Sequence, residues 1–185
     1  MLSRNLALYG MMGAGKTTVG RAVADRLGRR FADTDAELER WTGTTIPELF
    51  LAHGEAGFRD LERQVVEELS GYHDLVLALG GGTVLRDDNV ANLMLTGTLV
   101  ELRTTPEVLL ARLQDEADGR PLLAGEDLEA RLRATYAERE DRYAAVADVT
   151  IDAGRDVDAV VADVVAFALE AGDVLTPSEH EQVMT

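Results

Sequence analysis

The feature that most constrains the fold of this chain is a stretch near its start, Gly10-Met11-Met12-Gly13-Ala14-Gly15-Lys16-Thr17. The stretch matches the pattern G-x-x-x-x-G-K-[ST] without a mismatch. It follows a short apolar segment, 5–9, which suits a buried parallel strand, and it precedes 18–27, where valine and leucine recur at helical spacing. Glycines allow successive backbone N–H groups to face an anion, and a helix N-terminus adds positive potential. We therefore predict a phosphate-binding loop at the carboxyl end of the first strand.

In this pattern the lysine reaches the β- and γ-phosphates of a nucleotide, and the hydroxyl ligates Mg²⁺. The expected nucleotide-binding residues are Gly13, Ala14, Gly15, Lys16, Thr17 and Thr18. Lys16 is the only lysine among 18 basic residues, and a compact ammonium suits this position better than a guanidinium. There are two alternatives to a phosphate-binding loop. The single lysine could fall at this position by chance, or the apolar start could be a secretory signal. The glycines, the lysine and the lack of a clear cleavage site argue against a signal.

The composition suits a soluble protein with one main domain. The chain has 185 residues, 46% of them hydrophobic, and no apolar run long enough to cross a membrane. We expect a single domain over 1–172 and a flexible acidic tail over 173–185. Cysteine is absent, which excludes disulfides and fits a reducing compartment, so we expect a cytoplasmic protein. We also expect a monomer. The net charge of −16 argues against nucleic acid and anionic membranes as partners, so a nucleotide needs a local group of arginines.

Strands and helices alternate along the chain. The expected strands are 5–9, 30–33, 75–79, 98–102 and 149–151. The expected helices are 18–27, 36–41, 46–52, 55–69, 90–95, 106–114, 128–145 and 157–169. Gly54 is expected to break the helical pattern between the third and fourth of these helices, and the polar segment 115–127 to form a mobile loop. Such alternation is typical of a parallel α/β sheet, in which ligands bind at the carboxyl ends of the strands.

Two absences narrow the class of nucleotide-binding protein. GTP-binding switches of the Ras type use an Asn-Lys-x-Asp contact to guanine, and a chain without a second lysine cannot have one. The apolar strand 75–79 runs into Gly80-Gly81-Gly82 instead of the aspartate that motor-type ATPases carry there. Neither class is therefore favoured, and the phosphate loop by itself does not choose a reaction.

Four further motifs follow the phosphate loop. They are Asp33-Thr34-Asp35, Gly57-Phe58-Arg59, Gly80-Gly81-Gly82-Thr83 and Arg120-Pro121-Leu122-Leu123. In this order and at these spacings, over about residues 6–151, the chain resembles the shikimate kinase family. The resemblance implies a P-loop kinase fold like that of nucleoside monophosphate kinases, with a five-stranded parallel sheet flanked by helices. It also implies a substrate-binding helical segment at about 34–61 and a lid at about 115–127.

The resemblance further implies an activity and its site. The implied reaction is the ATP-dependent, Mg²⁺-requiring phosphorylation of the 3-hydroxyl of shikimate to shikimate 3-phosphate, in chorismate and aromatic amino acid biosynthesis. The implied catalytic residues are Lys16, Asp35 and Arg120, of which Arg120 also contacts the nucleotide. The implied shikimate contacts are Asp35, Arg59, Gly81, Gly82 and Arg139. The implied Mg²⁺ contacts are Thr17 and, through water, Asp33.

Several of these residues have a plainer interpretation. Asp35 suits the N-cap of a helix, and Asp33 suits the end of a strand. Arg59 suits a solvated helix face. Arg139 shares its helix with other arginines, which are Arg131, Arg133 and Arg142.

Two arginines are candidates for the adenine contact that the family makes. Arg112 precedes the expected lid but lies about one residue out of register, and Arg155 lies where the resemblance places an adenine loop. Thr17 stands where the family often has serine, which keeps the hydroxyl. Two alternatives to shikimate kinase remain: a related small-molecule kinase such as gluconate kinase, and a non-catalytic nucleotide-binding module. Release of ADP with and without shikimate would separate them.

Overall fold

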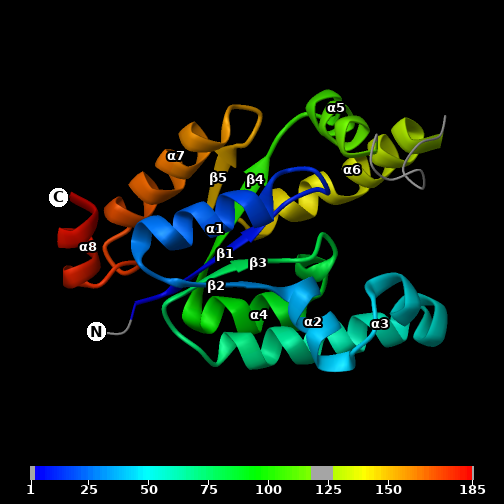
Figure 1. The fold of residues 1–185 in the computed structure, drawn as a ribbon, viewed down its shortest axis with the longest axis horizontal. Helices are drawn as coiled ribbons and strands as arrows, with labels where there is room; N and C mark the ends of the chain where they lie inside the picture. Colours follow the sequence, from blue (N-terminus) through cyan, green and yellow to red (C-terminus); the bar gives the residue numbers. More distant parts are fainter. Residues whose placement is uncertain (1–2, 118–126, 185) are drawn as a thin grey trace.

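The computed structural model describes residues 3–117 and 127–184, and its centre is a sheet of five parallel strands (Figure 1). The strands lie in the order β2-β3-β1-β4-β5. Their bounds are β1 Asn5–Tyr9, β2 Arg30–Asp33, β3 Leu75–Ala78, β4 Gly97–Arg103 and β5 Val149–Asp152. Every residue of β1 and β3 is buried, as is typical where helices cover both faces of a parallel sheet. The predicted five-stranded parallel sheet is confirmed.

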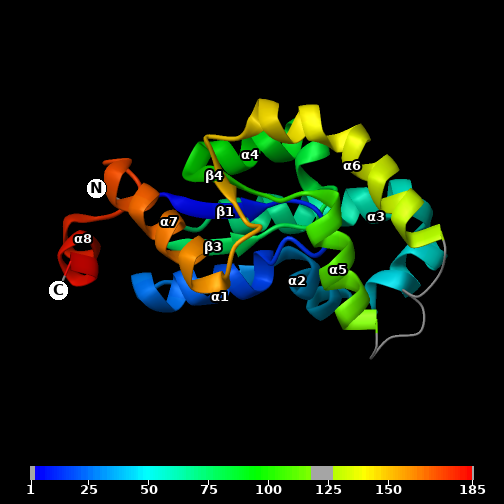
Figure 2. The ribbon, with the colours of Figure 1, turned by 90° about the horizontal axis from the view of Figure 1, so that it is seen from above.

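Helices cover both faces of this sheet. Their bounds are α1 Lys16–Leu27, α2 Thr34–Thr42, α3 Ile46–Ser70, α4 Asp87–Thr96, α5 Pro106–Ala117, α6 Asp127–Val146, α7 Val157–Glu170 and α8 Pro177–Met184, with a 3-10 turn, η1, at Thr83–Leu85. Helix α1 packs against α7 and α8, and α3 packs against α4. Figure 2 shows α1 on one side of the sheet and α4 on the other. Both chain termini lie at one end of the molecule, while α5, α6 and the start of α3 extend from the other end (Figure 1).

Local sequence signals set the helix boundaries. Gly15, with φ of 89°, caps α1, so this helix begins at Lys16, earlier than the predicted position. Gly28 ends α1 in the left-handed conformation, with φ of 66°. Gly54 has φ of 65° and ψ of −178°, which interrupts the helical path inside α3. The predicted break between the helices 46–52 and 55–69 is therefore confirmed, as a kink at Gly54 within α3.

The C-terminal segment differs from the expectation. The segment 173–185, expected to be a flexible acidic tail, contains a helix, α8 at Pro177–Met184, which packs on α1. The fully buried side chain of Arg29 donates to the two carboxylate oxygens of Glu179 at 2.8 and 3.1 Å, and to the carbonyl oxygen of Val174 at 2.6 Å. Thr176 and Glu179 also bond each other's backbone N–H, in the manner of a capping box. These contacts order the segment because Arg29 supplies an anchor from the far end of the chain.

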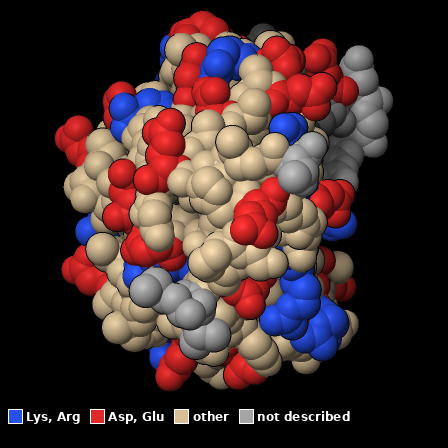
Figure 3. Space-filling view, turned by 90° about the vertical axis from the view of Figure 1, so that its left-hand side faces the viewer, with Lys and Arg blue, Asp and Glu red and all other residues tan. Residues whose placement is uncertain are grey.

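The surface near both termini carries no continuous basic area. Figure 3 shows this face, where acidic side chains surround a central uncharged area and the basic side chains stand in small groups. The pattern fits the net charge of −16. Within residues 3–117 and 127–184, no helix combines the length and apolar character that a membrane span requires.

Candidate active site

Most of the predicted site residues within the described part of the chain come together at the carboxyl ends of three strands. The phosphate loop follows β1, Asp33 closes β2, and the glycines 80–82 follow β3. Ligands of open parallel sheets bind in the crevice outside such strand ends. A cavity of about 580 Å³ opens there. Its lining includes Lys16, Thr17, Asp33, Asp35, Arg59, Gly80, Gly81, Gly82 and Arg139. Its volume suits a small-molecule site.

The phosphate loop folds back on its own lysine. Gly13 and Gly15 have φ of 82° and 89°, a region in which a side chain would be strained. Nζ of Lys16 donates to the carbonyl oxygens of Gly10 and Met11, each at 3.1 Å. Burial lowers the pKa of Lys16, and nearby carboxylates oppose that effect. The ammonium group is thus held against the loop, in the cavity where a bound phosphate would meet it.

Thr17 and Asp33 bring two oxygen atoms together beside the loop. The Thr17 hydroxyl donates to Oδ2 of Asp33 at 2.8 Å. Oδ1 of Asp33 accepts from the N–H groups of Asp35 and Ala36 at 3.0 and 3.3 Å, so Asp33 is the N-cap of α2. The alternative interpretation of Asp35 as this cap is therefore wrong.

The same two oxygens fit the ligand chemistry of Mg²⁺. This ion prefers oxygen ligands and is often held by one or two side chains together with substrate phosphates and water. The described part of the chain contains no group of three or more His, Cys, Asp or Glu side chains that could hold a metal. Thr17 and Asp33 therefore fit Mg²⁺ only together with phosphate oxygens or water.

Asp35 is a carboxylate with altered acidity. Burial raises the pKa of Asp35 from its ordinary value of 3.8 to about 6, and the negative charges of Asp33 and Glu62 add to this effect. The Lys16 ammonium opposes it. A carboxylate with this pKa is a stronger base than an ordinary one and is still mostly ionised at neutral pH. Perturbed acids and amines that share one cavity are typical of functional sites.

Arg59 is held by the buried carboxylate of Glu62. Nη1 of Arg59 donates to the two carboxylate oxygens of Glu62 at 3.2 and 3.0 Å, and Nη2 lies 3.7 Å from Oε1 of Glu55. The Glu62 side chain is 2% exposed and also accepts from the Thr83 hydroxyl at 3.0 Å. Since the Arg59 side chain is only 19% exposed and lines the cavity, the interpretation as a solvated helix face is wrong. A Cβ atom at Gly82 would overlap the Arg59 guanidinium, so Arg59 would have to move if this glycine were replaced.

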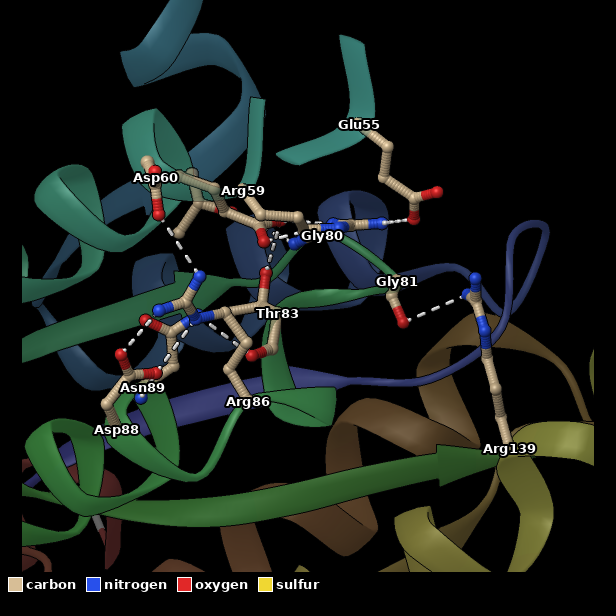
Figure 4. A network of polar contacts seen from close by, with 12 residues as sticks. Glu55, Arg59, Asp60, Gly80, Gly81, Thr83, Arg86, Asp88, Asn89 and Arg139 are labelled. Atoms are coloured by element: carbon tan, nitrogen blue, oxygen red, sulfur yellow. Dashed lines mark hydrogen bonds and ion pairs between the residues drawn. The ribbon is translucent and has the colours of Figure 1, made fainter. Parts of the chain in front are cut away.

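Arg139, on α6, also reaches the segment 80–85 that follows β3, which we call the glycine segment (Figure 4). Its Nη1 donates to the carbonyl oxygen of Gly81 at 3.1 Å. Its Nε is buried and has no hydrogen-bond partner within the described residues. A buried donor of this kind is costly unless a ligand or water satisfies it. The other arginines of α6 differ: Arg133 pairs with Glu107 and Glu129 at the surface, Arg142 bonds Val84 and Asp87, and Arg131 lines the cavity.

The two adenine candidates lie against other parts of the protein. Nη1 of Arg112 donates to the carbonyl oxygen of Gly13 at 3.3 Å, and Nη2 donates to that of Ala153 at 2.7 Å. Arg112 therefore connects the phosphate loop to the segment after β5. The guanidinium of Arg155 pairs with Asp163 of α7.

The expected lid falls largely outside the described residues. Helix α5 continues to Ala117 and α6 begins at Asp127, so the ends of the expected loop 115–127 are helical. Arg120 lies outside the described residues, and its role stays a prediction.

Three residues that support the site were given no role in the prediction. They are Thr34, which lies inside the motif Asp33-Thr34-Asp35, Glu62 and Tyr143. The Thr34 hydroxyl accepts from the Gly80 N–H at 2.9 Å, and the Tyr143 hydroxyl donates to the Gly81 carbonyl oxygen. Glu62 carried a signal, because it lies at helical spacing between apolar residues of the buried face of α3. No local sequence pattern indicated the roles of Thr34 and Tyr143, since their partners are backbone atoms distant in the sequence.

Comparisons with known proteins agree over most of the chain. The family model for Shikimate kinase matches residues 12–169. The shikimate kinase of Burkholderia lata is 46% identical over 171 residues, which cover 92% of each chain. That of Ralstonia nicotianae is 43% identical and covers 94% of this chain and 90% of the relative. The solved structure of the shikimate kinase from Acinetobacter baumannii in complex with shikimate has a TM-score of 0.82 at 40% identity, and covers 94% of this chain and 96% of that one. Because the identity is high and nearly the whole of each chain is aligned, this protein belongs to the shikimate kinase family.

Proposed function

We propose that this protein transfers the terminal phosphoryl group of ATP to the 3-hydroxyl of shikimate, with Mg²⁺, and yields shikimate 3-phosphate for chorismate and aromatic amino acid biosynthesis. The observation that carries the proposal is a single cavity lined by the phosphate loop and by two arginines, Arg59 and Arg139. A phosphoryl donor requires the loop, and an acceptor that bears a carboxylate suits a pair of guanidinium groups. The membership of the shikimate kinase family supports the same acceptor.

The nucleotide half of the proposed site is the phosphate loop with α1. Lys16 would hold the β- and γ-phosphates, while the backbone N–H groups of residues 13–18 surround them. The Thr17 hydroxyl and, through water, Asp33 would hold Mg²⁺, which neutralises phosphate charge when bound. Arg112 supports this half by bonding Gly13, and we keep it and Arg155 as the candidates for an adenine contact.

The acceptor half lies between Arg59 and Arg139. Arg59 projects from α3 and Arg139 from α6, so a carboxylate between them would be held from two elements. The Gly80 N–H is already bonded to the Thr34 hydroxyl, which leaves the N–H groups of Gly81 and Gly82 for shikimate. Asp35 then accepts hydrogen bonds from the ring hydroxyls in this proposal.

The proposed chemistry needs a base, charge neutralisation and alignment. With a pKa of about 6, Asp35 is ionised in roughly nine of ten molecules at pH 7, so it can take the proton of the attacking hydroxyl. The hydroxyl oxygen bonds to the γ-phosphorus as the bond to the bridging oxygen breaks, and ADP leaves. Most of the rate of such a transfer comes from positioning and electrostatic stabilisation, here by Lys16 and, on the basis of the resemblance, Arg120.

Two properties of the whole molecule belong to the proposal. The absence of cysteine from the sequence supports a reducing compartment, so we propose that the protein acts in the cytoplasm. We also propose that it acts as a monomer, since each half of the site is built from this one chain. Sedimentation at micromolar concentration would test the second statement.

The experiment is a coupled assay of ADP release with ATP and Mg²⁺. Turnover should require shikimate, stop with EDTA and give shikimate 3-phosphate by mass spectrometry. Lys16→Ala, purified in the same way, is the control for contaminating kinases and should lose about 10²-fold or more in kcat. Equal activity on gluconate or a nucleoside monophosphate would contradict the assignment. ATP binding without shikimate-dependent turnover would indicate a non-catalytic nucleotide-binding module.

A further inference from the structure

The glycine segment after β3 is held by three neighbouring residues of α6. Arg142 and Tyr143 follow Arg139 by three and four positions, so all three side chains project from one face of the helix. Nη1 of Arg139 and the Tyr143 hydroxyl both donate to the carbonyl oxygen of Gly81. Nε of Arg142 donates to the carbonyl oxygen of Val84, at 2.9 Å. Helix α6 therefore holds the segment at two points.

These contacts also fix the direction of the Gly82 N–H group, which points away from α6. A trans peptide is planar, so its C=O and the following N–H point in opposite directions. Because the Gly81 carbonyl is held toward α6, the N–H of Gly82 is held pointing away from α6. Glycine has the widest backbone freedom of any residue, so this orientation depends on bonds from outside the segment.

Tyr143 is well suited to supply such a bond. Its side chain is buried, and burial raises the pKa of its phenol, so the hydroxyl keeps its proton and donates. The ring packs edge to face on Tyr9, with 5.5 Å between the ring centroids. The Tyr9 hydroxyl in turn donates to the backbone carbonyl oxygen of Tyr143 at 2.8 Å. Since Tyr9 ends β1 directly before Gly10, Tyr143 contacts both the residue that precedes the phosphate loop and the glycine segment.

We propose that Tyr143 is a positioning residue, which orients the Gly81–Gly82 peptide for the acceptor and connects this peptide to the end of β1 through Tyr9. Within the described residues, Tyr143 does not line the cavity, so it acts through Gly81 and not by contact with a ligand. The inference rests on the proposed function, because it assigns the glycine segment to the acceptor.

The test is Tyr143→Phe, which keeps the ring and the backbone bond to Tyr9 and removes only the hydroxyl. The KM for shikimate should rise about tenfold, while kcat and the KM for ATP stay within about twofold, because one buried hydrogen bond of the acceptor half is lost. Tyr72→Phe is the matched control. Tyr72 is an exposed tyrosine whose hydroxyl donates to Glu68 at 3.1 Å, and its loss should leave all three constants within about twofold. An unchanged KM for shikimate, or an equal rise in the KM for ATP, would overturn the proposal.

A second measurement does not depend on the acceptor. Amide hydrogen exchange of residues 80–85 in the ligand-free protein should become about tenfold faster in Tyr143→Phe, while exchange in β1 and α1 stays unchanged. Exchange in 80–85 equal to that of the wild type would overturn the positioning role. If the wild type shows no shikimate-dependent turnover, the proposed function fails, and the exchange comparison still decides whether Tyr143 orders the glycine segment.

Discussion

Replacement of Asp35 by asparagine should make the ligand-free protein more stable at pH 8 while it removes most of the activity. The pKa of Asp35 is raised from 3.8 to about 6, mainly by burial. At about 1.4 kcal/mol per pKa unit, this shift corresponds to a cost of about 3 kcal/mol for the ionised carboxylate in the folded state. Asp35 is partly open to the cavity, where solvent lowers that cost, so we expect a gain of about 1–3 kcal/mol in the free energy of unfolding. Asparagine has nearly the same shape and carries no charge.

The gain should depend on pH with a definite sign. Between about pH 6 and pH 4, folded Asp35 binds a proton that the unfolded chain does not bind, so this group makes the wild type more stable as the pH falls. Asparagine does not titrate. The difference in unfolding free energy between Asp35→Asn and the wild type should therefore be largest at pH 8, shrink through pH 6 and approach a constant near pH 4.

Urea unfolding followed by circular dichroism at pH 8, 7, 6, 5 and 4 would measure this difference. Asp25→Asn is the matched control, because Asp25 is exposed on α1 and its loss should change stability by no more than about 0.5 kcal/mol. In the kinase assay, Asp35→Asn should lower kcat by about 10²–10⁴-fold, as expected when a general base is lost. A variant that is less stable than the wild type at pH 8, or equally stabilised at every pH, would refute the argument from burial.

Three further predictions test other parts of the structure. First, kcat/KM for shikimate should fall as the pH drops through about 6, because the ionised form of Asp35 is the active one. Initial rates from pH 5 to 8 would measure this dependence. A value of kcat/KM that does not change with pH would exclude Asp35 as the base. Second, Arg59→Lys should raise the KM for shikimate about tenfold or more and leave the KM for ATP nearly unchanged. An ammonium cannot bond both Glu62 and a ligand carboxylate as a guanidinium does. An equal rise in the KM for ATP would mean that Arg59 has only a structural role. Third, Arg29→Ala should lower the free energy of unfolding in urea by about 3–5 kcal/mol, because Glu179, which is only 15% exposed, and the buried carbonyl of Val174 lose their donor. Arg40→Ala, which breaks the exposed pair with Glu37, should lower it by less than about 1 kcal/mol. Equal effects would contradict the anchoring of α8.

The sheet and most helices could be predicted because their signals are local. The apolar runs of β1 and β3, the helical spacing in α1 and the break at Gly54 each lie within a few neighbouring residues. The helix boundaries could be predicted less precisely. Helix α1 begins at Lys16, directly after its cap Gly15, and not at the predicted residue 18. The 3-10 turn η1 was not predicted, because three residues are too few to show a period.

Helix α8 could not be predicted in the same way. Its own residues show little apolar periodicity, and within the helix none is buried. Its order comes from Arg29, a residue between α1 and β2 whose side chain needs the carboxylate of Glu179 and the carbonyl of Val174. These hydrogen bonds form only when the folded sheet brings Arg29 next to the C-terminal segment, so no local sequence pattern predicts them.

Within the described residues, Lys16, Asp35 and Arg59 of the predicted motifs line one cavity, and two of them depend on a residue outside the motifs. Glu62 bonds Arg59 with both carboxylate oxygens, and its negative charge helps to raise the pKa of Asp35. It also accepts from Thr83, which follows the three glycines directly. A chain with a net charge of −16 offers many exposed carboxylates that could attract a flexible arginine away from a ligand. A buried partner fixes the guanidinium by geometry instead, so the acidic surface and an anion-binding site can exist in one molecule.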